Sequence, residues 1–202
     1  SRHVLTLSLE QGESIETAST WDLTIRNDIA RRLIQALGQQ MFFLKRFHCD
    51  PHPGNFAFRE NGSVIIYDFG GVKTLSTDII THFKSLVNAA RKQDIPRIED
   101  ELTALDALAE KNKFPEDLYQ QWLEVLLRPL TTPYDFAENS AHHDGMKLVK
   151  KSFKYWDVFK PSPDTLMVNR TISGQYWNLI HLKVNDNLND VFESLVPSEQ
   201  LN

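Results

Sequence analysis

The strongest constraint on the fold of this chain is a change of hydrophobic period near residue 45. Before that point apolar residues recur at helical spacing, and after it comes a crowded polar stretch, RFHCDPHPGNFAF, from Arg46 to Phe58. The spacing predicts one long helix from about Trp21 to Leu44. Its start resembles a capping box, STWD, over Ser19–Asp22. The apolar face consists of Leu23, Ile25, Ile29, Leu33, Leu37, Met41 and Leu44.

The polar stretch leads into a predicted β-hairpin. Two short runs, Asn55–Glu60 and Ser63–Asp68, are separated by Asn61-Gly62, which is a strong hairpin signal. With a two-residue turn, Glu60 faces Ser63 and Asn55 faces Asp68. Both of these polar side chains then lie at one end of the hairpin, beside the loop that carries Asp50.

The remaining chain is predicted to be mostly helical. Val4–Glu10 alternates apolar and polar residues and is predicted to be a strand. From Ser76 onward the apolar spacing is helical, apart from a looser stretch at Arg128–Asp144 with two prolines. The last two predicted helices are Gly145–Phe159 and Pro163–Val184. The expected fold class is therefore mostly α with a small β-hairpin that holds a site.

Composition excludes several classes of protein. The 202 residues suffice for one domain, and 41% hydrophobic with 24% charged residues is ordinary for a globular protein. A net charge of −5 without a long basic run argues against a nucleic-acid partner. The single cysteine, Cys49, cannot form an internal disulfide, which fits a reducing compartment. No apolar run approaches the roughly 20 residues needed to span a bilayer, and no signal peptide or initiator Met is present. We therefore expect a fragment or processed piece that is not secreted.

The polar side chains of the loop and hairpin suit phosphate chemistry. An amide oxygen from Asn55 and a carboxylate from Asp68 are hard oxygen ligands, which favour Mg²⁺ over Zn²⁺. Mg²⁺ in proteins commonly uses one or two carboxylates together with substrate phosphates. Asp50, five residues before Asn55, could orient or deprotonate a hydroxyl.

These residues resemble the motifs of a known family. His48-Cys49-Asp50 matches the kinase H-x-D, and Asp68-Phe69-Gly70 is a literal D-F-G. The form FHCDPHPGN…IIYDFGGVKTLS resembles the UbiB (AarF-type) atypical kinases, in which His52 stands where protein kinases carry a lysine. VLTLSLEQG is similar to the hinge segment of that family, and NRTISGQYWNLIHLK to its C-terminal helix. The resemblance covers most of the chain and is most specific between Phe47 and Leu75.

The resemblance implies a protein-kinase-like C-terminal lobe over residues 1–202. Its parts would be a hinge strand at 1–12, the catalytic loop, hairpin and D-F-G at 46–75, and a helical subdomain at 76–202. It implies that Asp50 is the catalytic acid/base and that Asn55 and Asp68 hold Mg²⁺ on ATP. It also implies a gatekeeper at Leu7, and backbone contacts to adenine from Ser8 and Glu10.

The same resemblance implies partners outside the chain. The N-terminal lobe of a kinase supplies an ion-paired Lys and Glu and a phosphate-covering loop. Motifs of the type G-x-G-x-x-G, V-A-I-K and K-x-G-Q do not occur in this sequence. The chain is thus expected to be a C-lobe that needs its N-terminal lobe. Ubiquinone or other prenyl-quinone biosynthesis is the implied process, with a quinone-lipid substrate and a peripheral membrane contact. The implied location is the bacterial cytoplasm or inner-membrane periphery, or the matrix side of mitochondria or plastids.

Two other functions remain open. The motif D-x-H-P-G-N also occurs in phosphotransferases of the aminoglycoside/choline-kinase type, although Gly70-Gly71 and the hinge favour the UbiB type. A non-catalytic pseudokinase scaffold is the third alternative, and the intact Asp50, Asn55 and Asp68 argue against it.

Several other side chains are given structural roles. His48 and His52 are predicted to hydrogen-bond the loop backbone, and Cys49 to be a small packed residue. His142-His143-Asp144 is interpreted as a solvated loop rather than a metal site. Three tryptophans are interpreted as core residues. These are Trp122, Trp156 and Trp177.

Overall fold

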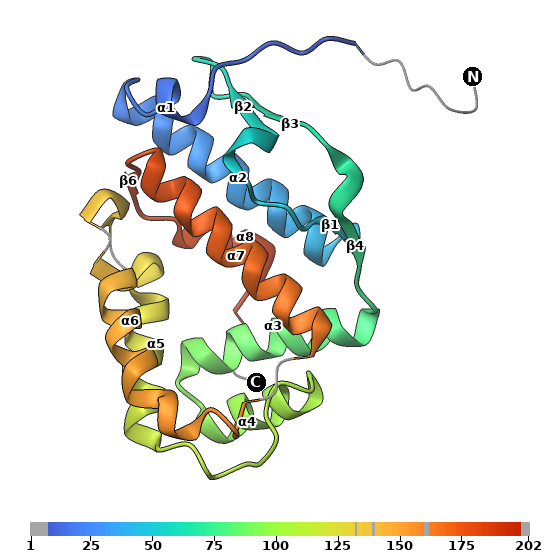
Figure 1. Cartoon of the computed structure of the whole chain (residues 1–202), viewed down its shortest axis with the longest axis vertical. Coiled ribbons are helices and arrows are strands. Elements are labelled where there is room, and N and C mark those ends of the chain that lie inside the picture. Colours follow the sequence, from blue (N-terminus) through green and yellow to red (C-terminus); the bar gives the residue numbers. More distant parts are fainter. Residues whose placement is uncertain (1–7, 132, 139, 160–161, 199–202) are drawn as a thin grey trace.

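The described part of the protein is mostly helical, with three small antiparallel sheets (Figure 1). The structure is a computed structural model that describes residues 8–131, 133–138, 140–159 and 162–198, and Leu7 lies outside these ranges. The α-helices are α1 (Ile15–Ala18), α2 (Leu23–Phe42), α3 (Thr77–Lys92), α4 (Ile95–Ala104), α5 (Glu116–Thr131), α6 (Ser140–Ser152), α7 (Pro163–His181) and α8 (Asn189–Leu195). The strands are β1 (Arg46–His48), β2 (Phe56–Phe58), β3 (Val64–Ile66), β4 (Val72–Thr74), β5 (Tyr134–Asp135) and β6 (Asn185–Asp186). Short 3-10 turns are η1 (Pro53–Asn55), η2 (Phe69–Gly71), η3 (Phe136–Glu138) and η4 (Phe153–Tyr155).

The long predicted helix exists as α2, but its predicted cap is wrong. The N-cap residue is Asp22, and its side chain makes no capping hydrogen bond. The hydroxyl of Ser19 instead donates to the carbonyl of Glu16 at 2.7 Å, at the end of the preceding helix α1. STWD thus joins two helices, and the helix is fixed by burial of its apolar face rather than by a cap.

The hairpin is confirmed, but its register differs from the prediction by one residue. Phe56 pairs with Ile66 and Phe58 with Val64, so Asn55 lies opposite Tyr67 and not opposite Asp68. The turn runs from Arg59 to Gly62, with the Gly62 N–H donating to the Arg59 carbonyl at 2.9 Å. Gly62 has φ +81°, which makes this a three-residue loop ending in a left-handed glycine. The extra loop residue moves Asp68 beyond the hairpin.

The first strand is not found in the described residues. Positions 4–7 of the predicted strand lie outside them, and Ser8–Gly12 have no regular structure and are exposed. A strand needs backbone hydrogen bonds to a neighbouring strand, and the first described residue that has them is Glu13, which forms a β-bridge with Phe58 of β2.

A second ladder, which the sequence did not suggest, joins β1 to β4. His48 pairs with Val72 and Arg46 with Thr74. The segment between the two strands, residues 49–71, therefore begins and ends at the same place in the structure. The ladder places residue 49 beside residue 71, and the Cys49 N–H donates to the Gly71 carbonyl at 2.7 Å. The catalytic-loop segment and the D-F-G segment are therefore neighbours in space.

The stretch predicted to be loose, Arg128–Asp144, is largely regular. Helix α5 continues to Thr131 and α6 begins at Ser140, so His142, His143 and Asp144 are helical and not in a loop. The guanidinium of Arg128 contacts Asp144 at 2.9 Å and joins the two helices. Spacing alone cannot foresee a charged pair of this kind between adjacent helices.

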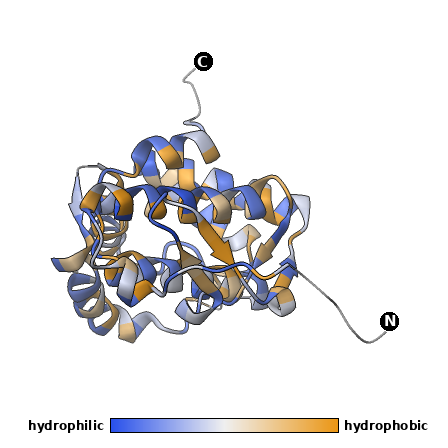
Figure 2. Ribbon diagram, turned by 90° about the horizontal axis from the view of Figure 1, so that it is seen from above, coloured by the Kyte–Doolittle hydropathy of each residue, from blue (hydrophilic) through white to orange (hydrophobic). Residues whose placement is uncertain are grey.

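The core lies around the pair α2 and α7, which run side by side in Figure 1. One cluster joins α2, the hairpin, α7 and α8 through residues such as Ile29, Phe58, Leu179 and Leu195. A second, containing Phe47, lies directly under the polar loop. Along the helical ribbons in Figure 2, hydrophobic and hydrophilic stretches alternate, as expected when each helix buries one face.

Of the three tryptophans interpreted as core residues, Trp122 packs against buried side chains. Trp177 is 40% exposed and Trp156 is 71% exposed, so the interpretation is wrong for these two residues. Trp156 follows η4, and its neighbours Tyr155 and Val158 pack into a core cluster while its own side chain does not.

Candidate phosphate-transfer site

The polar loop is rigidly built by its own side chains. The turn η1 begins after His52, whose Nδ1 accepts a hydrogen bond from the Gly54 N–H at 3.0 Å. Pro51 and Pro53 restrict φ on either side of His52. The predicted structural role of His52 is confirmed, and the loop reaches Asn55 with little conformational freedom.

Asp50 and Asn55 are in direct contact. The amide nitrogen Nδ2 of Asn55 donates to the Asp50 carboxylate oxygen Oδ2 at 2.8 Å and lies 3.3 Å from the Asp50 backbone oxygen. This hydrogen bond is the main cause of a lowered pKa of Asp50, with smaller contributions from the His52 backbone and the Arg170 guanidinium. Because Nδ2 faces Asp50, the oxygen Oδ1 is the Asn55 atom suited to a metal ion.

Asp68 is attached to the same loop through its backbone. His48, which is buried, places its ring nitrogen Nε2 2.7 Å from the Asp68 carbonyl oxygen. Because a carbonyl only accepts, this nitrogen carries the proton. The His48 ring also meets Phe69 edge-on, with 5.8 Å between ring centroids. His48 therefore ties the H-x-D segment to the D-F-G segment, which confirms its predicted structural role.

The backbone at Asp68 is unusual. Asp68 has φ +49°, and its carboxylate oxygen Oδ1 accepts from the Gly70 N–H at 3.0 Å. A left-handed aspartate is uncommon and is stabilised here by that local hydrogen bond. The turn η2 then brings Gly71 close to Asp50, because a Cβ added at Gly71 would lie 3.6 Å from the Asp50 Cβ.

Asp50 and Asn55 are thus in direct contact, and the backbone of the Asp68 turn lies beside the same loop, although not by the predicted cross-strand pairing. The donor set is one carboxylate and one amide oxygen, which fits Mg²⁺ completed by phosphate oxygens and water. Two protein oxygens are too few to hold a metal ion without phosphate oxygens and water. Among the described residues, no group of three or more His, Cys, Asp or Glu side chains could hold a metal ion, and this includes His142 and His143.

The described part of the predicted hinge segment contacts the hairpin. The Glu10 carbonyl accepts from the Tyr67 hydroxyl at 2.9 Å, and the Glu10 carboxylate pairs with Arg59 at 2.7 Å. Ser8 is exposed. The described part of the hinge segment therefore runs along the hairpin, from Glu13 beside Phe58 to Glu10, which contacts Arg59 next to the turn and the Tyr67 hydroxyl.

Helix α7 supports the loop from behind, and sequence reasoning missed this. The Asn178 amide donates to the Pro51 carbonyl at 3.1 Å, and the Arg170 guanidinium lies 3.9 Å from Asp50 Oδ1. Between them, a Cβ on Gly174 would come within 2.1 Å of Pro51 Cγ. The four-residue spacing of Arg170, Gly174 and Asn178 was the available signal, since it places all three on one helix face.

Cys49 is a packed residue, as predicted. Its side chain is buried in the cluster under the loop, and its Sγ lies 3.4 Å from the Phe47 carbonyl. Burial is the main cause of a raised pKa of the thiol. A thiol kept protonated is a poor nucleophile, so Cys49 fills space beneath Asp50 rather than reacting.

Comparisons with known proteins agree with the motif assignment. Residues 1–102 match the family described as the ABC1 atypical kinase-like domain. The chain is 35% identical over 83 residues to the Arabidopsis thaliana protein ACTIVITY OF BC1 COMPLEX KINASE 7, chloroplastic, covering 41% of this chain and 12% of that protein. It is 31% identical over 116 residues to protein sll1770 of Synechocystis, covering 54% of this chain and 19% of that protein.

A more distant relative matches nearly the whole chain. The zebrafish (Danio rerio) protein named Atypical kinase COQ8B, mitochondrial, is 21% identical over 197 residues, covering 95% of this chain and 31% of that protein. The chain thus spans between 12% and 31% of the length of these three relatives.

Among solved structures, Rv3197 of Mycobacterium tuberculosis, determined in complex with erythromycin, has a similar fold. The TM-score is 0.71 at 15% identity, covering 94% of this chain and 48% of that one. At that identity the likeness concerns the fold alone. The family match extends over just over half of the chain and contains Asp50, Asn55 and Asp68. This protein therefore belongs to the ABC1, or UbiB, family of atypical kinase-like proteins.

Proposed function

We propose that the chain is the C-terminal lobe of a UbiB-type atypical kinase or ATPase that binds Mg·ATP. The observation that carries the proposal is the contact of Asp50 with Asn55 beside a D-F-G turn that is held to the same loop by His48. Each of these residue types has a role in phosphoryl transfer, and the Asp50–Asn55 contact and the D-F-G turn belong to adjoining segments.

Each side chain is given one task in this proposal. Asn55 and Asp68 would hold Mg²⁺, which when bound supplies charge neutralisation on the phosphates. Asp50, kept ionised by Asn55, orients the attacking hydroxyl or water and accepts its proton. The backbone of Ser8 and Glu10 meets the adenine, with Leu7 as the gatekeeper. The remaining parts belong to an N-terminal lobe outside this chain.

The biological setting is proposed from the family resemblance and from the names of the relatives. Two relatives are named as chloroplastic and mitochondrial proteins. We propose a role in ubiquinone or prenyl-quinone biosynthesis, with a quinone lipid or its precursor as partner, on the matrix side of such an organelle or in a bacterial cytoplasm. Among the described residues, no helix has the length and hydropathy to cross a bilayer.

The test is Mg²⁺-dependent formation of ADP by the longest natural form of the polypeptide, compared with Asp50→Asn. The variant keeps the shape of Asp50 and an oxygen for Asn55, but it cannot accept a proton. We expect turnover to fall by about 100-fold or more while Mg·ATP still binds. Nucleotide binding without turnover in the natural protein would instead indicate a scaffold that senses ATP, and would contradict the enzymatic proposal.

A further inference from the structure

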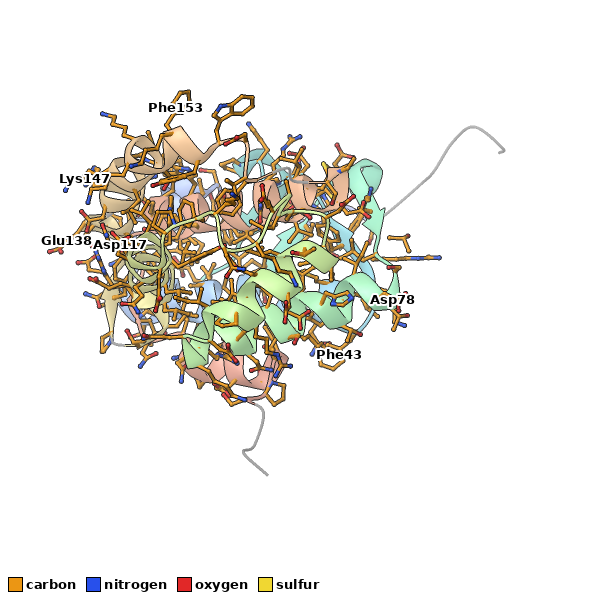
Figure 3. All side chains as sticks on the ribbon, turned by 90° about the horizontal axis from the view of Figure 1, so that it is seen from below. Phe43, Asp78, Asp117, Glu138, Lys147 and Phe153 are labelled. Carbon is orange, nitrogen blue, oxygen red and sulfur yellow. The ribbon has the colours of Figure 1, made fainter. Side chains whose placement is uncertain are left out.

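Helix α6 and the turn η4 carry an exposed apolar stripe that the proposed function does not use. Met146, Val149, Phe153 and Trp156 follow one another at spacings of three or four residues, which places them on one side of the helix and its continuation. Phe153 is 72% exposed and Trp156 71%, more than any other aromatic side chain in the described part of the chain. Figure 3 shows Phe153 projecting outward from the surface. Such side chains, gathered rather than scattered, indicate a contact surface.

A row of lysines borders this stripe. Lys147, Lys150, Lys151 and Lys154 are all exposed, and no acidic residue occurs between 147 and 154. Four positive charges within eight residues contrast with the net charge of −5 of the whole chain. In Figure 3, Lys147 and Phe153 project outward from neighbouring parts of the same side of the molecule.

The lysines have only weak ties to the protein itself. Lys147 pairs with Asp144 at 2.9 Å, three residues earlier on the same helix, and Lys151 donates to the Gln121 side chain at 2.9 Å. Lys154 lies 4.9 Å from the centre of the Tyr155 ring. Contacts of this exposed kind contribute little to stability and are readily exchanged for a stronger anionic partner.

The apolar stripe continues inward. Met146 and Val149 also line an open cavity of about 480 Å³ between α5, α6 and α7. Its outer walls include Leu126 and Ile172, which are themselves exposed. The apolar surface next to the lysine row is therefore larger than one helix face.

The combination of residue types selects the partner. Interfaces between proteins are depleted in lysine, whereas helices that lie in a membrane surface combine lysines with Trp and Phe. A nucleic-acid backbone offers nothing apolar to an exposed Phe and Trp. An anionic bilayer offers phosphates for the lysines and a hydrocarbon boundary for the aromatic rings.

We propose that residues 146–156 form a docking surface for an anionic lipid bilayer. Phe153 and Trp156 insert at the level of the headgroups, and Lys147, Lys150, Lys151 and Lys154 lie against the lipid phosphates. The surface is separate from Asp50, Asn55 and Asp68, so the proposal stands independently of the enzymatic one.

The test is co-sedimentation of the full chain with phosphatidylcholine vesicles, with and without 30% phosphatidylglycerol. The variants are the pairs Phe153→Ser with Trp156→Ser and Lys150→Gln with Lys154→Gln. We expect the natural protein to bind the anionic vesicles. Either double variant should bind them about tenfold or more weakly, because each lysine near an anionic surface is worth roughly a fivefold change in partition. High salt should weaken binding of the natural protein by a similar factor.

The chain supplies a matched control on another side. Phe43 is 54% exposed and Lys84 lies 5.3 Å from its ring centre, so Phe43→Ser with Lys84→Gln removes one exposed aromatic and one lysine elsewhere (Figure 3). This pair should bind vesicles like the natural protein. Failure of the natural protein to bind anionic vesicles, or binding that neither double variant weakens, would overturn the proposal. Equal binding to neutral vesicles would also overturn it.

Discussion

Asp50 has surroundings that favour its ionised form. Its carboxylate accepts the Asn55 amide hydrogen bond, which lowers the pKa of Asp50. A folded-state pKa below the unfolded value means that any stabilisation from this contact is present above about pH 4. It is lost as the pH falls through the folded pKa. At neutral pH the carboxylate is therefore ionised and ready to accept a proton.

Replacing Asn55 tests this assignment. In the natural protein without nucleotide, we expect the Asp50 carboxyl to titrate below the usual value of about 3.9. In Asn55→Ala the midpoint should rise, because the largest cause of the lowered pKa is removed. The measurement is an NMR pH titration of the Asp side-chain carbons. A midpoint that stays low in Asn55→Ala would show that another group controls Asp50.

At the scale of residues, the sequence predicted which side chains act together better than it predicted their backbone conformations and long-range contacts. The spacing of Asp50 and Asn55 predicted that they act together, and their hydrogen bond agrees. The left-handed backbone of Asp68 could not be predicted, because it depends on the Gly70 N–H and on the distant His48 ring. Likewise, no local pattern shows that Arg170 reaches Asp50 across 120 residues of chain.

At the scale of elements, the packing of α7 against the polar loop depends on one missing side chain. Gly174→Ala would place a Cβ within 2.1 Å of Pro51 Cγ, so the helix and the loop must separate. We expect a loss of about 1–3 kcal/mol in the free energy of unfolding, measured with urea. The nearby contacts of Asn178 and Arg170 should weaken with it, so nucleotide binding should fall too.

Gly145 in α6 is the matched control for Gly174. It is also a glycine inside a helix, but a Cβ there would meet Trp122 and Val125 at 3.9 Å, an ordinary contact. Gly145→Ala should therefore leave stability unchanged or raise it by up to about 1 kcal/mol, because alanine favours a helix. Equal losses in the two variants would mean that helix propensity, and not the approach to Pro51, explains Gly174.

The hairpin shows why elements were predicted more reliably than their register. Asn61-Gly62 suits a two-residue turn, and it equally suits the end of a three-residue loop with a left-handed glycine. Gly62 has a positive φ and Asn61 does not, which selects the second geometry. One loop residue changed the partner of Asn55 from Asp68 to Tyr67. The prediction that Asp68 lies near the polar loop does not depend on this register, because the β1–β4 ladder, and not the hairpin, brings Asp68 beside the loop.

At the scale of the whole molecule, segments far apart in sequence are joined to one another and to the site. Arg31 of α2 contacts Asp186 and Asp190 at 2.7 Å each, which ties the helix before the polar loop to the C-terminal part of the chain. Helix α7 lies beside α2 in Figure 1 and supports the loop. These long-range pairings follow from the complete fold, which explains why the predicted helices were found while their mutual arrangement was not foreseen.

The central claim is that this arrangement holds Mg·ATP through Asn55 and Asp68. The most direct variant is Asp68→Asn, because asparagine tolerates a positive φ and can still accept from the Gly70 N–H while removing the charge. Asp106→Asn is the matched control, since Asp106 also has a positive φ, of +57°, and is exposed elsewhere.

The measurement is a thermal-shift titration of the longest natural form of the polypeptide with ATP, with and without Mg²⁺. The account predicts Mg²⁺-dependent stabilisation of the natural protein, about 2.7 kcal/mol at a hundredfold excess over Kd. Asp106→Asn should keep this stabilisation and Asp68→Asn should lose it. No stabilisation of the natural protein, or an equal shift in Asp68→Asn, would contradict the account.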